Sequence, residues 1–192
     1  MRNGAELDIA PRQVRAWWQR HGQRLSRTLV AALAVVFGVA PTARPANVGT
    51  PAPAFTLPAL GNGTRVALDQ FRGKVVFVDF WASWCGPCRQ SLPLYEKLRA
   101  EFATAPFVIL AVDVDENDAD AQAFLRRHPV HYTILRDPGG SAPKAFGVVG
   151  MPSSYLIDRN GVIRLTHIGF EPKDIDNLRA RIRRLLEHGD AT

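Results

Sequence analysis

The chain has 192 residues, of which 46% are hydrophobic and 22% are charged, the composition of an ordinary globular protein with a single domain. Its net charge of +6 is concentrated near the N-terminus, because residues 1–40 hold six arginines against two acidic residues. The remaining residues carry 18 basic and 16 acidic side chains, so the composition does not predict a nucleic-acid-binding surface.

Residues 1–46 are predicted to form a basic leader ahead of a globular domain at 47–192. Arginines precede the apolar run 28–40, which is the pattern of an export signal. These 13 residues fall short of the roughly 20 that span a bilayer, yet no clean cleavage site follows them. A cleaved signal peptide and a retained inner-membrane anchor both stay open. Either one predicts a periplasmic or otherwise extracytoplasmic protein.

The next segments predict a hairpin and then a buried strand. Residues 61–63, Gly-Asn-Gly, separate two short strand candidates at 55–60 and 64–68. An apolar run at 75–80 leads through Trp-Ala-Ser-Trp into Cys85-Gly86-Pro87-Cys88, and an amphipathic stretch continues to Phe102. This order predicts strand, turn and helix, with both cysteines on the first helical turn.

That placement predicts redox chemistry. A helix N-terminus offers unpaired N–H groups and the positive end of the helix dipole. Such surroundings lower a cysteine pKa from about 8.5 to roughly 3.5–7.5. Cys85 is therefore predicted to be the nucleophile and Cys88 the buried resolving thiol, while Pro87 suits a helix start. We expect thiol–disulfide exchange through a mixed disulfide, with the cysteine pair as the redox group and no other cofactor.

Two other uses of the cysteine pair are less consistent with the sequence. Structural zinc needs two further ligands, but the chain has no third cysteine and a single close-spaced histidine pair, His128 and His131. We therefore predict no metal. A purely structural disulfide at this spacing closes too small a loop to stabilise the fold by much.

The second half of the domain alternates strands and helices. Residues 107–112 predict a buried parallel strand, and five polar residues at 113, 115, 117, 118 and 120 follow it. An EF-hand loop would need glycine at Asp118 and glutamate at Phe124, so we predict a solvated loop and a helix start instead. Residues 119–127 predict a helix, 132–135 a short strand, and 142–146 one or two helical turns.

The C-terminal part predicts a hairpin and a helix. Strand candidates at 154–157 and 162–167 flank Asp-Arg-Asn-Gly, a strong turn signal. The last helix is predicted to open at Glu171-Pro172, with a buried stripe that includes Ile175, Leu178 and Ile182.

The motif WCGPC after VDFWAS resembles the thioredoxin superfamily. The preceding VGTPAPAF and FRGK segments, and an insertion before Met151-Pro152, are similar to exported TlpA-like reductases, a redoxin group that includes cytochrome c biogenesis proteins. The resemblance implies a thioredoxin-like α/β fold. A central mixed β-sheet would be flanked by helices, with an N-terminal hairpin extension and the insertion ahead of a cis-proline loop.

The resemblance also implies roles for individual residues. Asp79 would be a buried acid beneath the disulfide that takes the proton of Cys88. Trp84 would shield the pair, and Met151 and Pro152 would seat the partner. The residues between the cysteines, Gly86 and Pro87, resemble those of reducing thioredoxins.

The implied protein is a monomeric reductase of protein disulfides, with a membrane thiol–disulfide protein as its electron donor. Ser91 stands where cytochrome c biogenesis members carry glutamate, so apocytochrome c is not implied as the substrate.

Two alternatives come from other classes. A copper-delivery protein of the Sco type would use both cysteines and a histidine such as His167, but those proteins carry C-x-x-x-C. A peroxiredoxin-like peroxidase would carry P-x-x-x-T-x-x-C, whereas this chain has Val78 and Ala82 at the proline and threonine positions.

Overall fold

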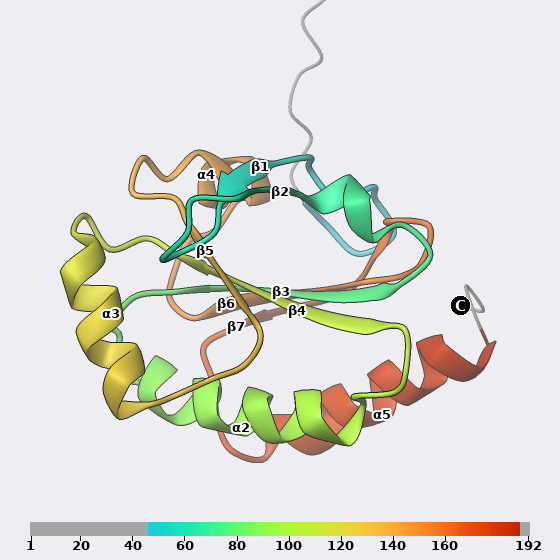
Figure 1. Cartoon of the computed structure of the whole chain (residues 1–192). Helices are drawn as coiled ribbons and strands as arrows, with labels where there is room; N and C mark the ends of the chain where they lie inside the picture. The colour runs from blue at the N-terminus through green and yellow to red at the C-terminus, as the bar shows by residue number, and fades with distance from the viewer. Residues whose placement is uncertain (1–45, 189–192) are drawn as a thin grey trace, which may run out of the picture. The chain divides into compact units, whose positions relative to one another are not determined.

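A mixed β-sheet forms the centre of the computed structural model, which describes residues 46–188 within a compact unit at 43–192. The predicted leader, with its apolar run 28–40, lies almost entirely outside the described residues. Within residues 46–188 the sheet has five strands in the order β5-β4-β3-β6-β7 (Figure 1). Their bounds are β3 (Val75–Trp81), β4 (Phe107–Asp113), β5 (Thr133–Arg136), β6 (Ser153–Ile157) and β7 (Ile163–Ile168).

The connections between strands explain the mixed directions. Strands β3, β4 and β5 run parallel, because the helices α2 (Cys88–Glu101) and α3 (Asp118–Arg127) carry the chain back between them. Strand β6 pairs antiparallel with both β3 and β7, and a tight turn at 158–161 joins it to β7. All seven residues of β3 are buried, as a central strand covered on both faces requires.

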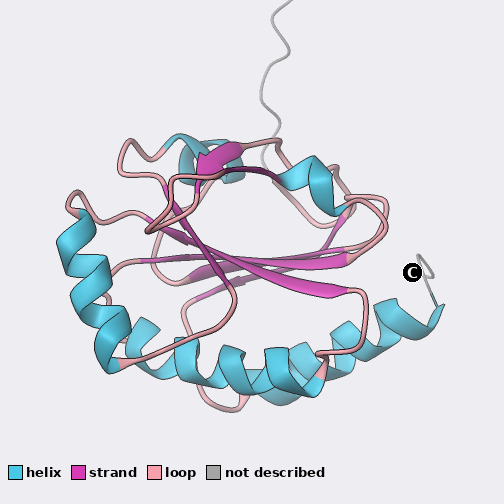
Figure 2. Ribbon diagram, in the orientation of Figure 1, coloured by secondary structure: helices cyan, strands magenta, loops and turns pink. Residues whose placement is uncertain are grey.

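Successive residues of β3 point into two separate cores. Val75, Phe77 and Trp81 pack with side chains of α2, α3 and α5 (Asp174–His188). The alternate residues pack against α4 (Ser141–Phe146) and an N-terminal hairpin of β1 (Thr56–Pro58) and β2 (Arg65–Ala67). A 3-10 turn, η1 (Leu68–Phe71), follows the hairpin. Figure 2 shows helices below the sheet and the hairpin with α4 above it.

The predicted fold is confirmed, and three local predictions are wrong. The helix after the motif begins at Cys88, so Cys85 lies in the turn before it. The last helix begins at Asp174 rather than at Glu171-Pro172. The acidic segment after β4 is not uniformly solvated, because Asp113 and Asp115 are buried. Among residues 46–188, no helix has the length and apolar character that crossing a bilayer requires.

Candidate active site

The two cysteines form a disulfide in the loop that follows β3. Their sulfurs are bonded at 2.05 Å and their Cα atoms lie 5.3 Å apart. The backbone N–H of Cys85 donates to the carbonyl of Ala82 at 3.1 Å, and Pro87 is the N-cap residue of α2. The first turn of α2 contains no acidic residue, so no carboxylate there opposes the positive end of the helix.

The disulfide is largely enclosed, but its neighbour on the loop is not. Cys88 is fully buried and Cys85 retains 4% exposure, which makes Cys85 the more accessible residue of the pair. The Trp84 side chain beside it is 65% exposed. This asymmetry suits attack by an outside group at the sulfur of Cys85.

Asp79 lies on the face of β3 that is covered by α2, because it stands two residues from both Phe77 and Trp81 and residues at that spacing share a face. It is 1% exposed, and neither carboxylate oxygen has a hydrogen-bond partner among the described residues. Burial raises the pKa of Asp79 well above its ordinary value. The hydroxyl of Ser154 on the neighbouring strand is close enough to offset part of this rise, although it does not meet the geometry of a hydrogen bond. Asp79 is therefore a carboxyl group that holds its proton far more tightly than one in water.

Asp79 affects the pKa values of two tyrosines in the same core. Burial raises the pKa of Tyr95 and that of Tyr132 well above the ordinary value, and the Asp79 carboxylate raises each further. Tyr95 belongs to α2, and the hydroxyl of Tyr132 donates to the carbonyl of Leu92 on the same helix at 3.2 Å. The acid thus lies in the layer between the sheet and the helix that Cys88 begins.

The peptide bond between Met151 and Pro152 is cis, as the resemblance implied. The next residue, Ser153, pairs with Phe80 near the end of β3, so the loop lies at the same end of the sheet as the disulfide. The Pro152 carbonyl accepts from the N–H of Gly169 at 2.8 Å. Met151 packs against the core cluster that contains both cysteines.

Three large apolar side chains are exposed at this end of the sheet. Trp84, Val149 and Ile168 are 65%, 82% and 62% exposed. Ile168 is the register partner of Ser153, next to the cis-proline loop. Its side chain also packs near Gly150, since its Cγ2 lies 3.6 Å from the position that a Cβ on that glycine would have. We call these three residues the apolar rim. Because they lie at the end of the sheet that carries the disulfide, these exposed apolar side chains are candidates for contact with another chain.

Sequence reasoning missed a polar network beneath the same loop. Asp115 accepts two hydrogen bonds from Ser83, and Asp113 and Arg136 hold Asp115 in turn. The sequence feature that could have indicated this network is the Asp-x-Asp pattern at 113–115. It stands at the end of a buried strand, beside the strand that leads into the cysteine motif. The prediction that these acids are solvated is wrong, because both are at most 3% exposed.

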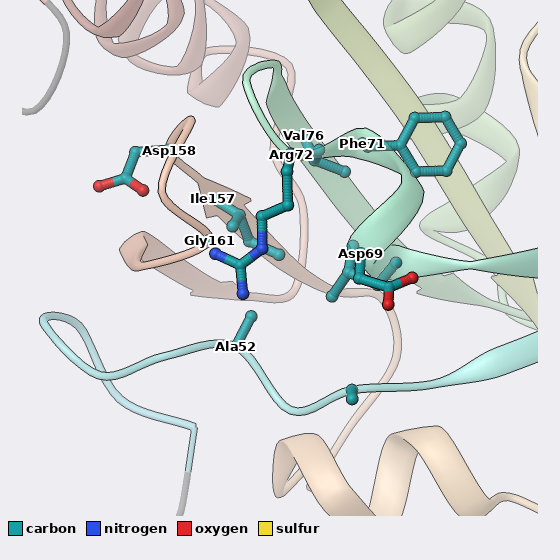
Figure 3. A pocket seen from close by; sticks show the side chains of 10 residues that line it. Ala52, Asp69, Phe71, Arg72, Val76, Ile157, Asp158 and Gly161 are labelled. Atoms are coloured by element: carbon teal, nitrogen blue, oxygen red, sulfur yellow. The ribbon is translucent and has the colours of Figure 1, made fainter.

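Two further features were candidates for a site. A cavity of about 40 Å³ lies at the start of β3, where the Arg72 side chain extends toward Gly161 (Figure 3). His167, which the copper-delivery alternative would use, has its Nε2 3.1 Å from Asp174 Oδ2. Within residues 46–188, no three histidine, cysteine or acidic side chains are grouped in a way that could hold a metal.

A redox-active C-x-x-C pair at the end of a central strand, beside a cis-proline loop in a thioredoxin-like fold, defines a thiol–disulfide oxidoreductase. The redoxin family model matches residues 47–182, and the chain belongs to that family.

Relatives carry matching names. Thiol-disulfide oxidoreductase ResA of Bacillus thuringiensis is 34% identical over 117 residues, which are 61% of this chain and 67% of the relative. Thioredoxin-like protein YneN of Bacillus subtilis is 34% identical over 123 residues, covering 63% and 71%. A solved structure named thiol:disulfide interchange protein DsbE, from Chlorobium tepidum, is 44% identical with a TM-score of 0.70, covering 73% of this chain and 98% of that one. These relatives do not favour copper delivery or peroxidase activity.

Proposed function

We propose that the protein is an extracytoplasmic reductase of protein disulfides. The observation that carries the proposal is the Cys85–Cys88 disulfide between a helix start and the cis Met151-Pro152 loop. In this proposal the reduced protein donates two electrons to a substrate disulfide and is left with its own pair oxidised. The Gly-Pro dipeptide between the cysteines supports the reducing direction, since it resembles that of reducing thioredoxins.

The first step is attack by the Cys85 thiolate on one sulfur of the substrate disulfide. A bond forms between Cys85 and that sulfur, and the other substrate sulfur leaves as a thiolate. The α2 N-terminus stabilises the attacking anion through its N–H groups and its dipole. Cys85 is the residue of the pair that keeps some exposure, which supports this assignment.

The second step needs a base for Cys88. Its thiol must lose a proton before its sulfur attacks Cys85, forms the internal disulfide and releases the second substrate sulfur as a thiolate. Both substrate thiolates then take up protons to give the dithiol. Asp79 is the proposed acceptor, because it is buried in the layer beneath α2 and no described residue hydrogen-bonds its oxygens. The acceptor is the ionised form of Asp79, and the raised pKa makes that carboxylate a stronger base than an ordinary one.

The partner is proposed to dock on the apolar rim. Trp84 lies on one side of the disulfide, while Val149 and Ile168 lie by the cis-proline loop. An extended protein segment there would bury apolar surface and could pair with the exposed backbone near Met151. Gly86 and Pro87 would lie under the segment, where the missing side chain of Gly86 and the compact ring of Pro87 leave room for it.

The leader supports a proposal about location, and that location in turn suggests a class of electron donor. The arginines and the apolar run 28–40 support export, and disulfide chemistry persists outside the cytosol. We propose that a membrane thiol–disulfide protein reduces the Cys85–Cys88 pair after each cycle. Residues 28–40 would either be removed on export or hold the protein at the inner membrane.

Insulin reduction by the reduced protein tests the activity, with Cys85→Ser as the matched control. We expect catalysed reduction by the wild type and none by the variant. Cys88→Ser should instead accumulate a mixed disulfide with its partner, whose identification would give the substrate. Equal rates for the wild type and Cys85→Ser would contradict the proposal.

A further inference from the structure

A single carboxylate holds the redox-active loop. The N–H of Ser83 donates to Asp115 Oδ2 at 2.8 Å, and the Ser83 hydroxyl donates to Oδ1 at 3.0 Å. Ser83 precedes Cys85 by two residues, and the Cys85 N–H is bonded to the residue before Ser83. Because both oxygens of Asp115 bind the same residue, the contact fixes that part of the loop in direction as well as in distance.

The backbone of Asp115 is itself held at both its N–H and its carbonyl. Its N–H donates to Asp113 Oδ1 at 3.1 Å, and its carbonyl accepts from Arg136 Nη1 at 2.8 Å. The same Arg136 nitrogen donates to Asp113 Oδ2, and its Nε donates to Asp118 Oδ1 at 2.7 Å. The network therefore runs from the start of α3, through the end of β5 and the end of β4, to the loop that carries Cys85.

The backbone supports the same connection. Trp81 and Asp113 are register partners at the ends of β3 and β4, and the N–H of Val114 donates to the Trp81 carbonyl at 3.1 Å. Asp115 is 3% exposed and Asp113 is fully buried, so water competes little for these bonds. Because these buried hydrogen bonds favour a single arrangement of the network, the loop that Asp115 binds is expected to be stiff.

We propose that Asp115 is a positioning residue that sets the reduction potential of the Cys85–Cys88 pair through Ser83. The proposal rests on the proposed function only in taking this pair to cycle between disulfide and dithiol. A stiff loop keeps the two thiols near the geometry of the disulfide, whose Cα atoms are 5.3 Å apart. This closeness raises the effective concentration of one thiol at the other and favours the disulfide.

Removing the anchor therefore shifts the equilibrium toward the dithiol. In Asp115→Ala we expect at least a tenfold change in the equilibrium constant with dithiothreitol, which is about 30 mV toward less negative potential. Ser83→Ala removes one of the two hydrogen bonds and should shift the constant in the same direction by less. Because both variants break the same contact, the double variant should match Asp115→Ala rather than show the sum of both shifts.

Asp137→Ala is the matched control. Asp137 is also a buried carboxylate that accepts from a backbone N–H, that of Ala142 at 2.7 Å, and from a serine, Ser141 at 3.1 Å. It serves the start of α4 rather than the redox loop, so its loss should lower stability and leave the equilibrium constant within twofold of the wild type.

An Asp115→Ala protein with a constant within twofold of the wild type would overturn the proposal. If that variant does not fold, Ser83→Ala and Asp115→Asn carry the test, and unchanged constants in both would overturn it equally. Failure of the proposed function is a separate outcome, since it would appear as a wild-type protein that does not reduce insulin. The potential is measured against dithiothreitol and needs no protein substrate.

Discussion

Replacing Asp79 by asparagine should change how the stability of the protein depends on pH. Burial raises the pKa of Asp79 in the folded protein well above the value of about 3.8 that it has when exposed. The stabilising contribution of this group is therefore fully present below about pH 4 and is lost as the pH rises through the folded-state pKa. Asparagine does not titrate, so the variant lacks this loss.

The size of the effect follows from a single proton. At pH values between the unfolded-state and folded-state pKa, the folded protein binds one more proton than the unfolded chain. This difference changes the free energy of unfolding by up to about 1.4 kcal/mol per pH unit. Asp113 contributes in the same direction, because burial raises its pKa to about 7. Wild-type stability should thus fall with rising pH, and Asp79→Asn should show a slope that is shallower by as much as one proton.

Urea unfolding of the oxidised protein at several pH values from 4 to 9 would measure this slope. Asp120→Asn, at the exposed start of α3, is the control for loss of a formal charge. Equal slopes for the wild type and Asp79→Asn would refute the assignment of Asp79 as a buried acid with a raised pKa. In the reduced protein, Asp79→Asn should also slow release of the mixed disulfide by roughly 10²–10⁴-fold, the usual contribution of a general base.

Three further substitutions separate recognition from stability. Trp84→Ala should lower kcat/KM for a protein disulfide by about tenfold, with a change in unfolding free energy below about 0.5 kcal/mol because the side chain is exposed; an unchanged kcat/KM would exclude Trp84 from docking. Leu92→Ala should cost about 2–5 kcal/mol in urea unfolding, since Leu92 is fully buried, and a cost below 1 kcal/mol would contradict that packing. Tyr132→Phe should cost about 1 kcal/mol for its lost hydrogen bond to Leu92, whereas no loss would show that this bond contributes nothing.

Local patterns made most of the fold predictable. The apolar run of β3 is buried on both faces, and turn residues at 61–63 and 158–161 mark the two hairpins. The cysteine pair needed no tertiary information, because its spacing and the helix after it lie within one short segment. The cis bond at Met151 was implied by resemblance alone, since composition does not distinguish it from a trans turn.

The anchor of the redox loop could not be predicted in the same way. Ser83 and Asp115 are 32 residues apart, and they meet because the register of β3 and β4 places Trp81 opposite Asp113. Asp113 is then neutralised by Arg136 from a third strand. Acidic residues after a strand are usually solvated, and only the pairing of three strands makes these two buried.

The ionisation of Cys85 in the reduced protein tests the central claim most directly. Thiolate formation can be followed by the pH dependence of alkylation, with Cys88→Ser used to assign the signal to Cys85. The start of α2 beside this sulfur predicts a pKa within roughly 3.5–7.5, below the ordinary value of about 8.5. An unshifted pKa near 8.5, together with no reduction of insulin, would contradict the account.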